Sequence, residues 1–529
     1  MLRSRSVVCN SLSRVDQLML TRAQRKKLLF FLFLTFLVRL VFSSFVGLID
    51  DEAYHWSWTK ELMLSYYDHP GMIAWLEWIS THLLGDTFWG VRLPSFIFYW
   101  ATVGLLWKLT EELFNEKAAW LITFLFLWSP FYGFGGYVAS PEAPFIFCWL
   151  AAAWAFWQGV KPDLKHWTVA KMWIVLGIIM GLGLNSKFIL ALIAPGFGIY
   201  LLTSKKRKML LTPWPYYGIL IATILCLPIF IWNIEYRWPG FYYQFYDRHT
   251  GREFSLNRWG VWFGAQFLFY TPVIFGLLVA SIVIGLKKFK LSPQWRLIIS
   301  LSIPSIIMFY PQPLWADYKP HWPGAAHMIL LMGASALLIE WRRTKPILAK
   351  ALMIGILGFY IPINFLTYSP FLGPWLPQVA RKINPEVKWD TKWDLSNEFF
   401  GWRELGAKLN EMQKDYHRDY GLKPFLAALR YETTAQTYWG SGQKTYMLSS
   451  PKSHYTVIQK HRGTLRGFIG QPALIVTTEK YPADPRNYAK WDSCEPTTFE
   501  VYRSFFGKPE LSRTFTIWAC SQFQGLLKE

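Results

Sequence analysis

Charged residues are scarce in this chain. Asp, Glu, Lys and Arg make up 17% of the 529 residues, against roughly 25% in ordinary soluble proteins, whereas 53% of the residues are hydrophobic and 19% are aromatic. Only 5 cysteines occur, and their spacing fits no metal site. No internal repeat is detectable, which argues against the repeated architecture of many transporters. The composition indicates a polytopic α-helical membrane protein.

Long apolar runs are abundant. Because the hydrocarbon core of a bilayer is about 30 Å thick, each crossing needs about 20 apolar residues. We predict about 11 transmembrane helices before residue 368. They lie near 28–47, 88–109, 118–134, 142–159, 171–185, 188–203, 214–232, 259–286, 296–311, 324–341 and 347–367.

Acidic residues are fewer than basic ones, 34 against 55, which gives a net charge of +21. The basic residues form no aromatic-basic module, so we predict no nucleic-acid partner. They cluster in short loops that all fall on one side of the membrane if the chain crosses 11 times, as the positive-inside rule requires for the cytoplasm. The clusters are 22–27, 205–208, 287–290 and 342–345.

The chain divides into three predicted parts. Residues 1–27 form a cytoplasmic tail, followed by a retained first helix, because Asp50 and Asp51 come after that helix where a signal peptide would have a small-residue cleavage site. Residues 28–367 form the transmembrane domain, with a first outer loop at 48–87. Residues 368–529 form a C-terminal α/β domain with a strand near 472–478 and a helix near 402–409.

Cysteines Cys494 and Cys520 fall in the predicted outer domain, so a disulfide between them is compatible with an oxidising compartment. Cys148 and Cys226 fall in apolar segments and are predicted to be core residues. The sequence alone predicts no oligomeric state.

Polar motifs separate from the basic clusters. With 11 crossings, the motifs around Asp51, Asp68, Glu142 and Lys187 all fall on the outer side, as do the segments 244–249 and 317–323. Each has a structural alternative: Asp51 at the start of an interfacial helix, Asp68 in a turn, and Glu142 at a helix N-terminus where a carboxylate favours the dipole. Lys187 in a tight hairpin needs a partner.

Together these residue types suit group transfer. A carboxylate can take a proton from an attacking hydroxyl, and fixed cations can hold a phosphate and stabilise the charge that grows on it as it leaves. The cations are Lys187, Arg248 and Lys319. His249 and His321 can ligate a metal, although no spaced pair supports this.

The motifs resemble those of the bacterial membrane glycosyltransferases related to the protein O-mannosyltransferases and to the lipid A aminoarabinose transferase. The resemblance extends over the membrane region and, more faintly, into the outer domain. It depends on residues 51–56, 67–75, 140–144, 181–187, 232–233 and 400–405, with Gln244 and His249.

This resemblance implies a GT-C fold, a polyprenyl-phosphate sugar as donor, and transfer with inversion at the outer face of the membrane. Asp51 matches the family's essential first-loop aspartate, whose expected role is general base. Glu142 stands where relatives usually have Asp, and Gly71 stands where many have a second proline. The site residues implied or proposed are catalytic Asp51 and Glu142; donor-phosphate ligands Lys187, Arg248 and Lys319; substrate contacts Glu52, Tyr54, Tyr67, Gln244 and His321; and Asp68 with His249 for a divalent metal cation.

The leading hypothesis is an inverting glycosyltransferase of the bacterial inner membrane, with its active site and C-terminal domain in the periplasm. The predicted acceptor is lipid A, lipopolysaccharide core or another envelope glycolipid, and the predicted partners are this lipid or glycolipid acceptor, the polyprenyl-phosphate donor and membrane lipids. An alternative acceptor is Ser or Thr of exported proteins. A lipid transporter or flippase is the alternative from a different class, and a receptor anchored by its helices is a third.

Overall fold

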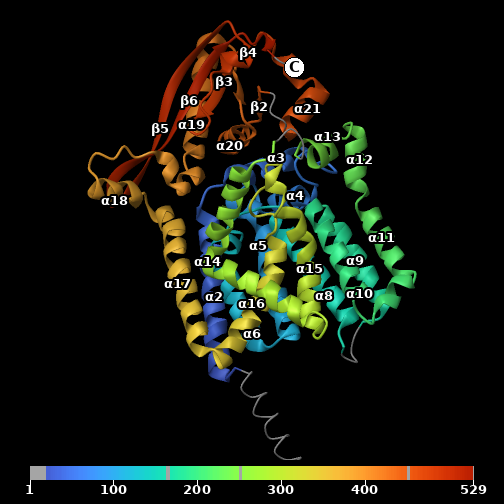
Figure 1. Ribbon diagram of the computed structural model, residues 1–529. Helices are drawn as coiled ribbons and strands as arrows, with labels where there is room; N and C mark the ends of the chain where they lie inside the picture. Colours follow the sequence, from blue (N-terminus) through green and yellow to red (C-terminus); the bar gives the residue numbers. More distant parts are fainter. Residues whose placement is uncertain (1–19, 163–166, 249–252, 450–452, 528–529) are drawn as a thin grey trace, which may run out of the picture.

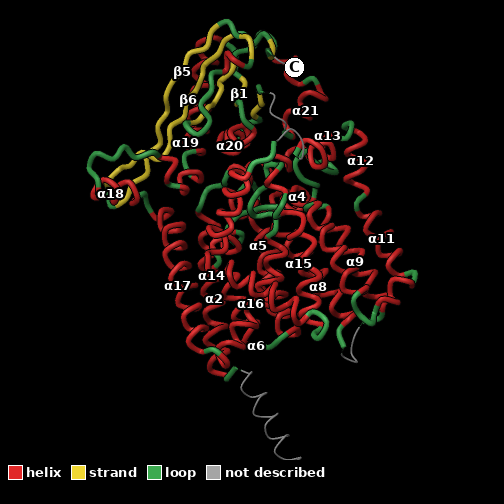
Figure 2. Tube along the Cα trace, in the orientation of Figure 1, coloured by secondary structure: helices red, strands yellow, loops and turns green. Residues whose placement is uncertain are grey.

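The computed structural model describes residues 20–162, 167–248, 253–449 and 453–527. A bundle of apolar helices occupies the first two thirds of the chain, and a mixed β-sheet with its own helices lies at one end of the bundle (Figure 1). Figure 2 separates the two parts by secondary structure, with the strands confined to the end that holds the C-terminus.

Each of the predicted crossings coincides with a helix or a pair of helices. The bounds are α2 Arg22–Phe45, α5 Phe88–Leu113, α6 Glu116–Trp128 with α7 Pro130–Phe134, α8 Glu142–Val160, α9 Val169–Leu184, α10 Ala194–Leu202 after a 3-10 turn, α11 Trp214–Leu225 with α12 Leu227–Glu235, α14 Leu256–Lys288, α15 Pro293–Phe309, α16 Gly324–Thr344 and α17 Pro346–Tyr368.

By length and composition, fewer of the described helices qualify as single spans than the 11 predicted. Among the described residues, 6 helices are long and apolar enough to cross a membrane, or 7 if α11 and α12, which meet at a bend of 43°, form one span. The helix α5 is long enough but carries Arg92 and a charged last turn, whereas α6, α9 and α10 are short. Apolar periodicity thus located the helices.

Burial distinguishes central from peripheral helices. In their most apolar windows, 83% of α8 and 78% of α16 are buried, against 17% for both α2 and α17. A helix that is apolar on all sides and buried belongs in the centre of a bundle. The main core cluster therefore forms around α5, α6, α8 and α16, with Leu106, Phe126, Trp149 and Leu330 among its buried members. The peripheral helices α2 and α17 leave large apolar side chains exposed, as contact with lipid requires.

The C-terminal part begins with α18 Trp375–Ile383 and contains a five-stranded sheet in the order β2-β1-β3-β6-β5. The strand β1 pairs in parallel with β2 and β3, while β6 is antiparallel to both β3 and β5. The predicted strand and helix are confirmed as β3 and α19. The bounds are β1 Phe425–Ala428, β2 Thr445–Met447, β3 Ala473–Thr478, β5 Ser493–Phe505, β6 Lys508–Ser521, α19 Trp402–Tyr420, α20 Tyr431–Ser441 and α21 His454–Arg462, with β4 Ala489–Lys490 and β7 Gly525–Leu526 forming a second small sheet.

Both faces of the main sheet are covered. Leu405 and Leu409 of α19 pack with Leu426 and Leu474 on one face, and Phe425 packs with other buried aromatic side chains on the opposite face. Cys494 and Cys520 face each other across β5 and β6 and form a disulfide, whereas Cys148 and Cys226 are free and buried. The domain boundaries predicted at residues 27 and 367 stay predictions.

Candidate active site

The loop between α2 and α5 contains two short helices, α3 Asp50–Trp58 and α4 Met72–Leu84. Three acidic residues occupy the first turn of α3, where carboxylates favour the positive end of the helix dipole. The fully buried Glu52 accepts hydrogen bonds from the backbone N–H groups of Ile49, at 3.1 Å, and Ala139, at 2.7 Å. It also forms a bidentate ion pair with Arg92 of α5, whose Nε and Nη2 atoms lie 2.7 and 2.6 Å from the two carboxylate oxygens.

Arg92 connects α3 to the end of α2. Its remaining guanidinium N–H groups donate to three backbone carbonyls, those of Ser43, Val46 and Gly47. With both side chains almost completely buried, the pair fixes the angle at which α3 leaves the bundle. Glu52 therefore has a structural role, and the substrate contact predicted for it from the sequence stays a prediction.

Asp51 points into an acidic environment. Solvent reaches its side chain, yet protein atoms surround the carboxyl group on most sides. This partial removal from water, together with the charges of neighbouring carboxylates, raises the pKa of Asp51 to about 7. These neighbours are Asp50, Glu142, Asp68 and Glu432. A carboxyl group with a pKa near neutrality is well matched to general-base catalysis.

Asp68 lies in the loop between α3 and α4. Its carboxylate accepts a hydrogen bond from the Tyr54 hydroxyl, which in turn accepts from the backbone N–H of His454 at 2.8 Å. Its backbone carbonyl accepts from the Gln244 side chain at 2.6 Å. Burial raises the pKa of Asp68 to about 6, although the Tyr54 hydrogen bond and the charge of Arg248 lower it. Asp68 thus joins three segments that are distant in sequence.

A cation and a carboxylate meet on the bundle side of the site. The buried Lys187, which follows α9, forms an ion pair with Glu142 at the start of α8. His321, in the segment before α16, places its Nε2 atom 3.5 Å from the same Glu142 oxygen. Lys187 therefore has the partner that its position in a tight apolar hairpin requires.

Arg248 is held at the rim of the site by aromatic and amide groups. Its guanidinium donates to the Gln244 side chain at 3.0 Å and to the Tyr243 hydroxyl at 3.2 Å. It also lies over the rings of Tyr243 and Trp322, at 4.5 and 5.1 Å from their centroids. Tyr67 stacks on Tyr243 with centroids 4.7 Å apart. None of these contacts involves a carboxylate, so aromatic rings, a hydroxyl and an amide orient Arg248.

Two histidines complete the cluster, His55 of α3 and His69 of the loop, with ring centroids 5.9 Å apart. Burial and the charge of Lys187 outweigh the charge of Glu142, so the pKa of His55 falls to about 4 and that of His69 falls well below its ordinary value. Both imidazoles are therefore neutral at pH 7. The sequence motifs contain these residues, but nothing in the sequence shows that they face Lys187 and Glu142.

The C-terminal part closes the site from the other side. The Gln436 side chain of α20 donates to the Leu48 carbonyl at 2.8 Å and to Asp50 at 3.3 Å. Lys480 lies 3.6 Å from the other Asp50 oxygen, and the ring of Tyr431 lies 4.7 Å from that of Tyr54. The sequence reasoning missed these contributors, because no local pattern connects residues almost 400 positions apart.

Two predicted site residues, Lys319 and His249, are not among the contacts above. Lys319 is exposed, and no ion pair joins it to another described residue. His249 lies outside the described residues. Within the described ranges, no group of three His, Cys, Asp or Glu side chains could hold a metal ion. Asp68 uses its carboxylate to hold Tyr54; the metal site predicted from Asp68 and His249 stays a prediction, and no catalytic step is derived through it.

The fold is that of a polytopic membrane glycosyltransferase of the GT-C type. It matches the crystal structure of ArnT from Cupriavidus metallidurans in the apo state with a TM-score of 0.63 over 94% of this chain and 98% of that chain, at 12% identity. The same protein bound to undecaprenyl phosphate matches with a TM-score of 0.59 over 93% of this chain and 97% of that chain, at 14% identity.

The family resemblance inferred from the motifs is confirmed. Residues 68–232 match the family described as dolichyl-phosphate-mannose-protein mannosyltransferase. The chain is related to the lipid A galacturonosyltransferase RgtD of Rhizobium johnstonii, 23% identical over 55% of this chain and 61% of that protein. It is also related to the undecaprenyl phosphate-alpha-4-amino-4-deoxy-L-arabinose arabinosyl transferase of Serratia proteamaculans, 28% identical over 56% of this chain and 54% of that protein. The matches thus span about half the length of these curated relatives.

Proposed function

We propose that this protein is an inverting glycosyltransferase that moves a sugar from a polyprenyl-phosphate donor to lipid A, lipopolysaccharide core or another envelope glycolipid. The observation that carries the proposal is the gathering of Asp51, Asp68, Glu142, Lys187 and Arg248 around one site. These residues come from five segments of the chain, yet their charges act on one another. The relatives named above are transferases of this class, two of them with lipid A or undecaprenyl phosphate in their names.

The donor phosphate would bind near Lys187 and Arg248. Lys187 is buried and Arg248 is held in position by Gln244 and Tyr243, so both cations are arranged before the substrate arrives. Lys319 is available at the rim as a third cation. His321 can contact the substrate from the same segment as Lys319, and Tyr67 and Tyr54 supply aromatic surface and a hydroxyl group already oriented by Asp68.

An apolar cavity leads away from Lys187 and suits the polyprenyl chain. It has a volume of about 390 Å³ and lies between α9, α10, α11 and α12. Phe188, next to Lys187 in sequence, lines it together with Leu184. The helices approach closely at Gly177, where an added Cβ would lie 2.5 Å from the Gly218 carbonyl oxygen. A donor can thus keep its lipid tail in apolar surroundings while its phosphate reaches the cations.

The chemistry requires one displacement. An acceptor oxygen forms a bond to the anomeric carbon of the sugar, the bond from that carbon to the phosphate oxygen breaks, and polyprenyl phosphate leaves with the bonding electrons. Asp51 takes the proton of an attacking hydroxyl, and the cations stabilise the charge that develops on the leaving phosphate. If the acceptor group is itself a phosphate, it carries no proton that needs removal, and Asp51 serves to orient it.

The basic clusters indicate the side on which the site lies. They occur at helix ends remote from α3 and from the C-terminal sheet; α2, for example, starts near its own cluster and ends next to α3 (Figure 1). Because basic loops stay in the cytoplasm, we infer that the active site and the C-terminal part are periplasmic in a bacterial inner membrane. The disulfide between Cys494 and Cys520 is compatible with that compartment.

Incubating the purified protein with a polyprenyl-phosphate sugar and extracted lipid A tests the function. We expect a lipid A product whose mass increases by one sugar and whose yield collapses for Asp51→Asn. Equal product from both proteins would remove the proposed base, and no product from any envelope glycolipid would reject the acceptor class.

Transfer to Ser or Thr of exported proteins is a second candidate, favoured by the family match to protein mannosyltransferases. Mass spectrometry of a deletion strain separates the two. Loss of a sugar from lipid A or core supports a glycolipid acceptor, whereas loss from exported proteins supports a protein acceptor.

A further inference from the structure

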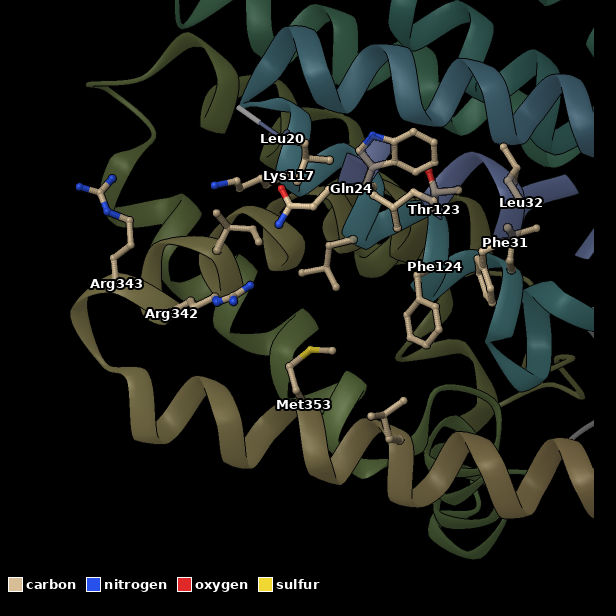
Figure 3. Close-up of a pocket in the computed structure, with 16 residues that line it drawn as sticks. Leu20, Gln24, Phe31, Leu32, Lys117, Thr123, Phe124, Arg342, Arg343 and Met353 are labelled. Atoms are coloured by element: carbon tan, nitrogen blue, oxygen red, sulfur yellow. The ribbon is translucent and has the colours of Figure 1, made fainter. Parts of the chain in front are cut away.

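A second cavity lies at the end of the bundle opposite the candidate active site. Its volume is about 810 Å³, and its walls come from the first turns of α2 and α6, the last turn of α16, and α17 (Figure 3). These segments lie at the ends of helices whose other ends approach α3 and the C-terminal sheet. Nothing in the glycosyl transfer proposed above uses this cavity.

Most of the cavity wall is apolar, while cations stand at one end. Figure 3 shows Phe31 and Phe124 on one side and Met353 of α17 on another, with Arg342 extending toward the space between them from the end of α16. Arg343 is also part of the lining. Both arginines are exposed, and no ion pair joins either of them to another described residue. The cavity therefore combines an apolar interior with uncompensated positive charge at its mouth.

The surroundings identify what can enter. The two helices that flank the cavity, α2 and α17, are the peripheral ones, with only 17% of their apolar windows buried, so lipid is their neighbour. Lys345 and the basic residues 22–27 place further positive charge at the same end. Basic pockets between transmembrane helices at a membrane surface bind anionic headgroups, and an apolar wall of this kind accommodates acyl chains.

We propose that this cavity is a binding site for one anionic phospholipid. Arg342 and Arg343 bind its phosphate, and the apolar side chains of Leu28, Phe31, Leu121 and Phe124 hold an acyl chain. A zwitterionic phospholipid has the same tails but no net charge, so the site discriminates between the two by headgroup. The proposal is independent of the sugar-transfer function and of the membrane sidedness inferred above.

Native mass spectrometry of the purified full chain in neutral detergent provides the test. Titration with phosphatidylglycerol should give a one-to-one adduct, tighter than the adduct with phosphatidylcholine. The double variant R342Q/R343Q should weaken phosphatidylglycerol binding about 30-fold, from about 1 kcal/mol per cation near an anionic headgroup, and leave phosphatidylcholine binding unchanged. The matched control K205Q/K206Q removes two cations of another basic cluster that do not line the cavity, and it should bind phosphatidylglycerol as the parent does. If both double variants bind phosphatidylglycerol equally more weakly than the parent, the lipid is attracted by the general positive charge of the protein, and the proposed site is rejected.

A steric variant tests the apolar part. Leu121→Trp fills the cavity without changing its charge and should abolish the one-to-one adduct, whereas Leu121→Ala enlarges the cavity and should retain it. Met353→Trp fills it from the opposite wall if Leu121→Trp does not fold. A folded Trp variant that binds as the parent does contradicts the proposal. The proposal is also contradicted if the full chain forms no adduct with phosphatidylglycerol but a chain lacking residues 1–19 forms one. That result would assign the cavity to the chain's own N-terminal segment.

Discussion

Replacing Arg92 by Met should lower the free energy of unfolding by about 3 to 5 kcal/mol, the usual cost of breaking a buried ion pair. Arg92 is 2% exposed and Glu52 is 0% exposed, so Glu52 would keep its charge with no water and no cation to compensate it. Three backbone carbonyls would also lose their donor. The methionine fills much of the vacated volume, so the loss is chiefly electrostatic.

The buried thiols Cys148 and Cys226 supply the assay, because a thiol-reactive dye labels them only as the protein unfolds. For 529 residues, an unfolding entropy of about 2.1 cal/mol/K per residue makes 1 kcal/mol worth about 1 °C. We therefore expect Arg92→Met to lower the midpoint of thermal unfolding by roughly 3 to 5 °C. The control is Lys108→Gln, which breaks an exposed pair with Glu111 and should shift the midpoint by less than about 1 °C.

The double variant Glu52→Gln/Arg92→Met isolates the charge. The amide oxygen of the glutamine at position 52 can still accept hydrogen bonds from the Ile49 and Ala139 N–H groups, and no uncompensated charge stays buried. About half of the lost stability should therefore return. A single variant that unfolds with the parent, or a double variant as unstable as Arg92→Met alone, would refute the argument that this ion pair holds α3 in place.

Three further changes test the site. Asp51→Asn should reduce turnover about 10²- to 10⁴-fold, and parent turnover should rise as the pH increases through about 7, since only ionised Asp51 accepts a proton; a flat pH profile would exclude it as the base. Lys187→Gln should raise the KM for the polyprenyl-phosphate donor about 10- to 100-fold and Lys187→Arg much less, and unchanged donor kinetics in both would remove Lys187 from phosphate binding. Tyr54→Phe removes a hydrogen bond that lowers the pKa of Asp68. In the parent, folding raises this pKa from 3.8 to about 6, so the folded state binds the proton more tightly and loses stability as the pH rises across that interval. In Tyr54→Phe this loss should extend to higher pH in thermal unfolding between pH 4 and 8, and identical curves would contradict the role of the hydrogen bond.

The helices could be predicted from the sequence because apolar runs and their breaks are local. The run 214–232, for example, corresponds to α11 and α12. The bend at Cys226 was not predictable in the same way, since Pro228 marks a break but not its angle of 43°. The helix α5 is long but carries Arg92, and it does not qualify as a span by length and composition alone. That charge is tolerated because Glu52, 40 residues away, neutralises it, and a hydropathy pattern has no access to such a partner.

The candidate site was predictable in part for a related reason. The assignment of Asp51, Asp68, Glu142 and Lys187 to one side depended on the predicted alternation of 11 crossings, and the structure does bring their charges together. The functions of Glu52 and Asp68 required knowledge of their partners: one is saturated by Arg92, and the other supports Tyr54. Gln436 and Lys480 carry no motif at all, and only the docking of α20 and the sheet onto α3 reveals them.

The charges of the site without substrate are arranged so that an anionic substrate can replace one of them. Lys187 is paired with Glu142, and Asp51 lies in the field of four other carboxylates. A phosphate that binds between Lys187 and Arg248 would compete with Glu142 for Lys187, leaving Glu142 to His321, 3.5 Å away. The added negative charge would raise the pKa of Asp51 still further, so with donor bound the turnover should need a higher pH to keep Asp51 ionised. We propose that Glu142 is a placeholder for the phosphate, because it holds a negative charge within reach of Lys187 until the donor binds.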